Sequence, residues 1–304
     1  MFSHTVPDYL YTNDGKRIFY CTNFSKVTDH HEPLLVFNYG LVCSNHHWAK
    51  QLPYFDKKKF KILIHDYRGH FNSSKEETLE QCNFTTFAND LHKIIEKIKS
   101  IYPINNIIMF GHSMGVNVTL EYAKLFPQEL IAMVLISGTV FPPHDVMFNT
   151  NIMDFLMPYL EFLKKKSPKF FKSIWDLAPY IPITQRLIRR GGFNPNKVSM
   201  EFIQIYLHKI KQLGPDLFFK LFDEMGKHNA ISYLHELNVP SLIIGGDQDK
   251  IIPNYIQNII HKRLKGSEIY IVKDGSHVPQ VDFPETINER ILLFLNKIVK
   301  NNNL

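Results

Sequence analysis

The stretch that most constrains this chain is residues 107–115, Ile-Ile-Met-Phe-Gly-His-Ser-Met-Gly. A short apolar run ends at Gly111, and a segment with helical character begins just after Ser113. A serine whose hydroxyl must point into open space needs a sharp, strained turn. Side chains two residues before or after it would collide with the neighbouring strand or helix, so Gly111 and Gly115 make room. The pattern predicts a nucleophilic Ser113 on a strand–turn–helix, and the alternative is that Ser113 only caps a helix.

Apolar runs and helical periodicity alternate on both sides of this motif. Strands are expected at residues 16–24, 34–37, 61–66, 107–110, 132–136, 241–244 and 268–272. Helices are expected at residues 85–101, from 114 to about 126, at 255–264 and near the end of the chain. Since most of these strands are wholly apolar, they predict an α/β fold with a mostly parallel central sheet and helices on both faces.

The alternation breaks between residues 139 and 232, where prolines and glycines interrupt helical stretches and no strand pattern occurs. We therefore expect a core domain of residues 1–138 and 233–304, with residues 139–232 inserted as an all-helical lid. This segment holds 11 of the 24 phenylalanines. Some should form the lid's own core, and others should line an apolar pocket over Ser113.

Charge is concentrated in the same segment, which has 13 Lys/Arg and 8 Asp/Glu and so carries +5 of the net charge of +6. The surplus can reflect solvated helix faces, or attraction to an anionic substrate or peripheral contact with a membrane surface. The sequence has no zinc-ligand spacing and no long basic block, so we expect no nucleic-acid partner. It does not predict an oligomeric state.

The three cysteines, Cys21, Cys43 and Cys82, have scattered spacings and an odd count, which favours reduced thiols over a disulfide framework or a metal site. Met1–Thr12 lacks the pattern of a signal peptide, and the apolar runs are too short for a transmembrane helix. A cytoplasmic protein without metal or cofactor is expected.

A serine hydroxyl needs a base, and the base needs an orienting acid. In a doubly wound sheet such groups come from loops at the carboxyl ends of strands. The loop after residues 241–244 contains Asp247 and Asp249, and the loop after residues 268–272 contains His277. Other histidines lie near the motif: His112 should point into the packing between sheet and helix, and His46 and His47 should shape the pocket or face water.

The order serine, aspartate, histidine resembles that of the α/β-hydrolase superfamily, and the resemblance extends over nearly the whole chain. Four further motifs carry it: Tyr39-Gly40-Leu41, Asp66-Tyr67-Arg68-Gly69-His70, Gly246-x-x-Asp249-x-x-x-Pro253, and Gly275-Ser276-His277 followed by Asp282-Phe283-Pro284-Glu285. The resemblance implies that Ser113 is the nucleophile, His277 the base and Asp249 the acid. It also implies that the backbone N–H groups of Leu41 and Met114 form the oxyanion hole. The spacing to Pro253 favours Asp249 over Asp247.

Two positions depart from the family pattern. Tyr39 replaces the histidine before Gly40, and its hydroxyl could supply another hydrogen bond that holds the loop. Phe71 replaces the second glycine of the D-x-R-G-x-G turn, which predicts a locally different turn near the pocket mouth. For Asp66 and Arg68 we expect an ion pair that holds the loop rather than a catalytic role.

The resemblance implies a cofactor-free serine hydrolase that acts on a small-molecule acyl substrate. It would cleave an ester or thioester with an apolar acyl part through an acyl-enzyme. One alternative is a C–C bond hydrolase acting on a β-diketone-like substrate with the same triad. Another is a hydrolase-like ligand-binding protein with little turnover. Aminopeptidase and acyl-transfer activity also stay open. Dehalogenase and epoxide hydrolase chemistry are disfavoured, because those relatives carry an aspartate where this chain has Ser113.

Overall fold

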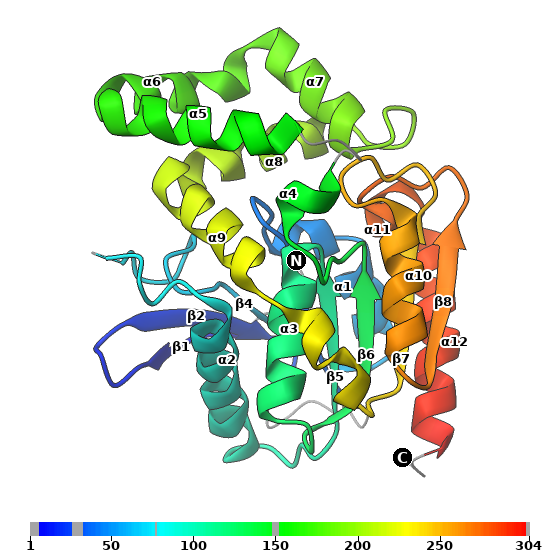
Figure 1. Ribbon diagram of the computed structural model, residues 1–304. Coiled ribbons are helices and arrows are strands. Elements are labelled where there is room, and N and C mark those ends of the chain that lie inside the picture. The colour runs from blue at the N-terminus through cyan, green and yellow to red at the C-terminus, as the bar shows by residue number, and fades with distance from the viewer. Residues whose placement is uncertain (1–5, 26–32, 77, 148–151, 302–304) are drawn as a thin grey trace.

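An eight-stranded sheet forms the centre of the molecule (Figure 1). The computed structural model describes residues 6–25, 33–76, 78–147 and 152–301; Met1–Thr5, and Phe148 of the insertion, lie outside this description. The strands are β1 (Val6–Tyr11), β2 (Arg17–Thr22), β3 (Leu34–Asn38), β4 (Lys61–His65), β5 (Ile107–His112), β6 (Leu130–Ile136), β7 (Ser241–Gly246) and β8 (Ser267–Val272). Their order across the sheet is β1-β2-β4-β3-β5-β6-β7-β8.

Pairing is parallel from β4 through β8, and only β2 runs antiparallel to its neighbours β1 and β4. The predicted, mostly parallel α/β fold is therefore confirmed. The sequence did not predict β1, because its six residues include Pro7 and Asp8 and form no buried apolar run. An edge strand can tolerate such residues, since one side of its ladder needs no partner.

Both faces of the sheet are covered by helices, and successive strand side chains point to opposite faces. In β3, Leu34 and Val36 belong to the same buried cluster as residues of α2 (Phe84–Lys99), α3 (Met114–Leu125) and α10 (Asn254–Arg263). Leu35 and Phe37 point to the other face and belong to a second buried cluster, with residues of α1 (Gln51–Lys57) and α12 (Pro284–Asn301). This double burial explains why the central strands are apolar without interruption.

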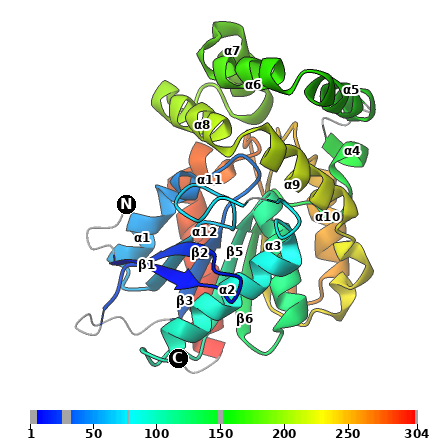
Figure 2. The ribbon, with the colours of Figure 1, turned by 90° about the vertical axis from the view of Figure 1, so that its left-hand side faces the viewer.

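All elements described between β6 and β7 are helical, and Figures 1 and 2 show most of them above the edge where the parallel strands end. They are α4 (Pro143–Val146), α5 (Ile152–Lys166), α6 (Pro168–Leu177), η3 (Ala178–Tyr180), α7 (Pro182–Gly192), α8 (Met200–Leu213), α9 (Pro215–Lys227), η4 (Ala230–Ser232) and η5 (Leu234–Glu236). Phe193, Phe202 and Leu207 belong to a buried cluster that also contains Val278. None of the described helices combines the length and hydrophobicity needed to cross a bilayer.

The helix that follows Ser113 also holds both ends of this insertion. Asn117 on α3 donates from Nδ2 to the carbonyl of Thr139, where the chain leaves the core, at 3.2 Å. The same Nδ2 lies 2.9 Å from Nδ1 of His228, where α9 ends. One turn further along α3, Glu121 Oε2 lies 3.3 Å from Nε2 of His228. The polar network therefore connects the insertion to the helix that begins at the candidate nucleophile.

Candidate active site

Ser113 is the single residue between β5 and α3, and its backbone has φ +53° and ψ −123°. This left-handed value is costly for a residue with a side chain, so the predicted strained turn is present. A β-carbon at Gly111 would lie 2.7 Å from the Gly115 carbonyl oxygen, and one at Gly115 would lie 2.2 Å from that of Asn38. The Ser113 side chain makes no capping hydrogen bond to α3, so the capping interpretation is wrong.

Asp249 and His277 are hydrogen-bonded, with Oδ2 of Asp249 2.9 Å from Nδ1 of His277. The other carboxylate oxygen accepts from the backbone N–H groups of Ile251 at 2.8 Å and Ile252 at 2.9 Å. Asp247, the alternative carboxylate, is exposed. Because the backbone fixes Asp249 in this orientation, its Oδ2 can accept the Nδ1 proton of His277, in the tautomer that leaves Nε2 able to take up a proton.

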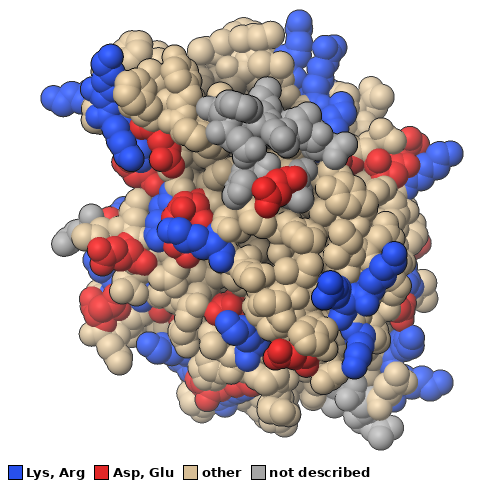
Figure 3. Space-filling view, viewed as in Figure 1, with Lys and Arg blue, Asp and Glu red and all other residues tan. Residues whose placement is uncertain are grey.

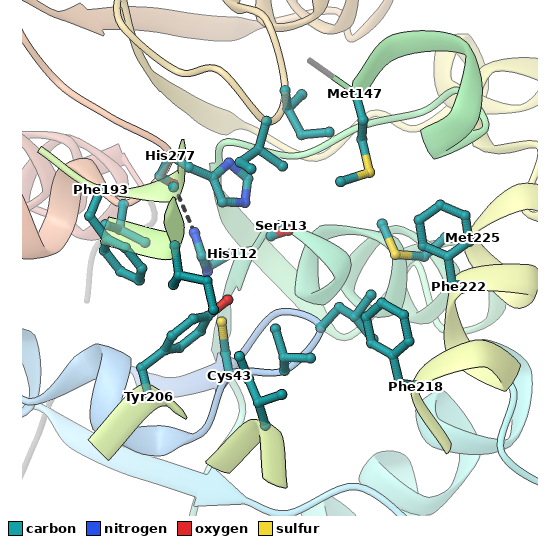
Figure 4. Close-up of a pocket in the computed structure, with 18 of the residues that line it drawn as sticks. Cys43, His112, Ser113, Met147, Phe193, Tyr206, Phe218, Phe222, Met225 and His277 are labelled. Carbon is teal, nitrogen blue, oxygen red and sulfur yellow. Dashed lines mark hydrogen bonds between the residues drawn. The ribbon is translucent and has the colours of Figure 1, made fainter. Parts of the chain in front are cut away.

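Two further contacts hold the histidine loop. The backbone N–H of Ser276 donates to Oδ2 of Asp282 at 2.7 Å, and burial raises the pKa of Asp282. Nε2 of His112 lies 2.9 Å from the carbonyl oxygen of His277, the contact dashed in Figure 4. The sequence predicts that His112 points into the packing between sheet and helix; the residue is fully buried, and it also lines the cavity and contacts the His277 backbone.

Burial lowers the pKa of each of the other histidines near the site, His46, His47 and His112. Burial lowers the pKa of His47 to about 3, and burial followed by the neighbouring His277 and His47 brings the pKa of His112 well below its ordinary value. Their rings lie 6.0 Å apart, and both residues line the cavity. His46 is half-buried against Phe202. His277, in contrast, has a carboxylate partner in Asp249.

The backbone around Ser113 offers two N–H groups. A β-carbon at Gly40 would lie 2.8 Å from Cβ of Ser113, so the loop carrying Leu41 runs directly against the serine. Met114 is the first residue of α3, where helix geometry leaves the N–H without an intrahelical acceptor. Within the described residues, neither the Leu41 nor the Met114 N–H has a hydrogen-bond acceptor. Both groups predicted for an oxyanion hole thus lie next to Ser113.

Ser113 and His277 open onto one cavity of about 350 Å³ (Figure 4). Phenylalanines and methionines of the insertion line it, together with aliphatic residues of the loops after β3 and β7. The sequence could not say which insertion residues these would be. They include Met147, Leu156, Met157, Leu160, Trp175, Ile188, Phe193, Tyr206, Ile210, Phe218, Phe222 and Met225.

Tyr39 stands where the family pattern has a histidine, and its hydroxyl makes a hydrogen bond, as expected. Its Oη donates to Oδ1 of Asp66 at 3.3 Å, and the Tyr67 hydroxyl donates to the Tyr39 carbonyl at 3.0 Å. The prediction of an ion pair between Asp66 and Arg68 is wrong. Asp66 also accepts from the backbone N–H and Nδ2 of Asn72 at 3.1 and 2.7 Å, whereas Arg68 pairs with other carboxylates, those of Asp14, Glu76 and Asp90.

The turn at Phe71 has φ +25°, so a phenylalanine occupies a backbone conformation that favours glycine. The Phe71 ring lies 6.0 Å from the Tyr39 ring, and Nζ of Lys209 from α8 lies 4.4 Å from its centroid. These contacts connect the turn both to the loop before Leu41 and to the insertion.

One group of described side chains has metal-ligand atoms close together, namely His92, Glu96 and Glu129. Nζ of Lys99 lies 3.2 Å from Glu96 and 3.1 Å from Glu129, and it supplies a positive charge there. None of these residues lines the cavity at Ser113. The three cysteines are free and buried, and burial raises the pKa of the thiol of Cys43, which lines the same cavity as Ser113.

Known proteins share this architecture. A bifunctional esterase/perhydrolase of Acinetobacter calcoaceticus is 24% identical over 297 residues, 94% of this chain and 99% of that protein. A proline iminopeptidase of Saccharolobus solfataricus is 22% identical over 278 residues, 88% of this chain and 86% of that protein. The structure of an esterase from Exiguobacterium antarcticum superposes with a TM-score of 0.72 at 17% identity, over 96% of this chain and 100% of that one.

A family model described as the alpha/beta hydrolase fold matches residues 33–284, a range that contains every strand from β3 to β8 and all the candidate site residues above. Because this match spans most of the sequence, the chain belongs to the α/β-hydrolase fold family.

Proposed function

We propose that this hydrolase cleaves a carboxylic ester or thioester with an apolar acyl part, using Ser113, His277 and Asp249. The observation that carries the proposal is the hydrogen-bonded Asp249–His277 pair beside a strained, uncapped Ser113, all at one apolar cavity of about 350 Å³. The esterase named among the relatives agrees with it.

In the proposed reaction, the Ser113 hydroxyl attacks the acyl carbon while Nε2 of His277 takes its proton. Asp249 keeps the imidazole in the required tautomer and stabilises the imidazolium that forms. The N–H groups of Leu41 and Met114 donate to the tetrahedral oxyanion. His277 then protonates the leaving alcohol or thiol, and water activated by the same imidazole releases the acid from Ser113.

The preference for an apolar acyl part rests on the lining of the cavity. Apart from Ser113 and the histidines beside it, its walls are mostly hydrocarbon, aromatic rings and thioethers. Removing an acyl chain from water there is favourable, whereas a polar acyl group would lose its hydrogen bonds to water without replacement.

The test is turnover of four matched substrates that differ in the bond cleaved: a butyryl ester, thioester and anilide, and a β-diketone of similar size. The ester and thioester should be turned over by the wild-type protein and not by Ser113→Ala. Turnover of the diketone alone would overturn the proposal in favour of C–C bond hydrolysis. Binding of all four substrates without turnover would overturn it in favour of a binding protein.

A further inference from the structure

Helices α5 and α6 are apolar on two sides. Their inner sides contribute Met157, Leu160 and Trp175 to the cavity over Ser113. On the outer side of α6, Phe170, Ile174 and Leu177 follow one another at helical spacing and are 68%, 48% and 59% exposed. A helix with apolar residues on both sides normally has a partner on both. Here the inner side faces the cavity, and no described residue covers the outer side, where these three side chains are exposed.

The outer apolar surface continues beyond α6. It includes Tyr159 and Phe162 on α5, Tyr180 in η3, and Ile183 and Leu187 on α7, all exposed. We call these residues, with the three of α6, the outer lid face. Ten of the 17 exposed large apolar side chains of the described chain lie between residues 152 and 192. Such clustering is typical of a docking surface, because single apolar residues scattered over a surface would show no such bias.

Positive charge gathers at the same place. Residues 152–192 contain eight Lys/Arg and three Asp/Glu, and the remaining charges of the insertion cancel. Lys165, Lys166, Lys169, Arg186 and Arg190 are exposed and make no ion pair with any described residue. Figure 3 shows blue side chains at both ends of the upper rim, where α5–α7 lie in Figure 1.

We propose that the outer lid face docks on the surface of an anionic lipid bilayer. Aromatic and aliphatic side chains would enter the boundary between headgroups and acyl chains, while the basic residues around them meet the lipid phosphates. The charge argues against a second copy of this chain as the occupant. Two such faces would bring like charges together, whereas an anionic lipid surface complements them.

The face also connects to the candidate active site. Leu156 on α5 lines the cavity and is 39% exposed, so the cavity wall reaches the outside next to the outer lid face. Docking there would place the cavity beside lipid acyl chains. This last step, an acyl lipid as substrate, rests on the proposed function, whereas docking itself does not.

The docking test is flotation of Ser113→Ala protein with vesicles of phosphatidylcholine alone, or of equal parts phosphatidylcholine and phosphatidylserine. Ser113→Ala removes turnover, so binding is measured whether or not the proposed hydrolysis occurs. Binding to the anionic vesicles only is expected. The triple change Lys165→Gln, Lys166→Gln, Lys169→Gln should weaken it by roughly a hundredfold, since each basic residue near an anionic surface contributes a factor of about five.

Matched controls distinguish this surface from any other. Phe170→Ser, Ile174→Ser and Leu177→Ser together should abolish flotation, whereas Leu293→Ser on α12, which is 65% exposed in the folded chain, should not. Lys57→Gln, Lys58→Gln and Lys59→Gln at the end of α1 remove the same charge elsewhere and should change little. In the catalytically intact protein, the α6 variant should keep kcat/KM on a soluble butyryl ester and lose turnover of an ester embedded in anionic vesicles.

Three results would overturn the proposal. One is equal flotation with both kinds of vesicle. Another is flotation that the α6 and lysine variants leave unchanged. The third is a dimer in sedimentation equilibrium that the α6 variant converts to a monomer, because the face would then be covered by a second copy of the chain.

Discussion

Gly40 and Ser113 lie so close that a β-carbon on the glycine would come within 2.8 Å of the serine Cβ. The same added carbon would lie 3.0 Å from the His112 carbonyl oxygen, so neither side has room to move without shifting backbone. This contact sets the distance between the loop carrying the Leu41 N–H and the candidate nucleophile. The geometry of the proposed oxyanion hole therefore depends on the absence of a side chain at position 40, which is a glycine.

Gly40→Ala should lower kcat on a butyryl ester by about a hundredfold to a thousandfold, the loss typical when one oxyanion donor is removed. The reason is that the added methyl pushes the Leu41 loop away from Ser113. Gly191→Ala is the matched control, because a β-carbon there meets nothing within 4 Å. Wild-type kcat in Gly40→Ala would show that the Leu41 N–H does not bind the oxyanion.

Asp249→Asn should lower kcat by a factor on the order of 10⁴, the loss known for the equivalent change in a serine protease triad. An amide at this position cannot stabilise the imidazolium of His277 and can turn the ring to the wrong tautomer. Asp247→Asn, two residues away and exposed, is the control and should cost far less. The reverse ranking of the two variants would assign the acid role to Asp247.

Glu121 should make the free energy of unfolding depend on pH under acidic conditions. Burial alone would raise its pKa, but hydrogen bonds from His228 and Thr85 outweigh burial and lower the pKa from 4.5 to about 2. A carboxylate with a depressed pKa stabilises the fold above its unfolded value, and this contribution is lost as pH falls through the folded value. Glu121→Gln should therefore destabilise the protein by up to about 3 kcal/mol near neutral pH.

The difference in free energy of unfolding between wild type and Glu121→Gln should stay constant above about pH 4.5 and shrink as pH falls towards about 2. Urea unfolding of both proteins across that range measures it. A difference in free energy of unfolding that is the same at about pH 2 and above about pH 4.5 would mean that the contact between Glu121 and His228 does not depend on the charge of Glu121.

Acyl-chain length should tune activity. For p-nitrophenyl esters, kcat/KM should rise from acetate towards a medium chain by roughly tenfold for every two buried methylenes, and fall once the cavity is full. Phe222→Ala enlarges the cavity and should move the optimum to longer chains, whereas Phe170→Ala, on the outer lid face, should leave it in place. A flat or falling series from acetate onward would reject the apolar acyl substrate.

Much of this arrangement could be predicted because it depends on short local patterns. The elbow at Ser113, the loops after β7 and β8, and the strand-free insertion each follow from glycine spacing, apolar runs and proline positions. Parallel strands bring their carboxyl ends together, so residues 164 positions apart, such as Ser113 and His277, could be assigned to one site.

The parts that could not be predicted depend on contacts between distant segments. His112 was expected between sheet and helix, but the carbonyl of His277 supplies a partner that no local pattern reveals. Arg68 pairs with Asp90 on α2 rather than with Asp66, because the loop folds back on that helix. The outer lid face likewise required the structure, since spacing alone does not say which of two apolar helix sides lines a cavity.

Reaction of the protein with a fluorophosphonate probe tests the central claim, that Ser113 is the nucleophile. One adduct per chain is expected, located on Ser113 by peptide mass spectrometry, with parallel loss of labelling and ester turnover in Ser113→Ala. Asp249→Asn should slow labelling, because His277 then loses its orienting partner. An adduct on another residue, or ester turnover that persists in Ser113→Ala, would contradict that claim.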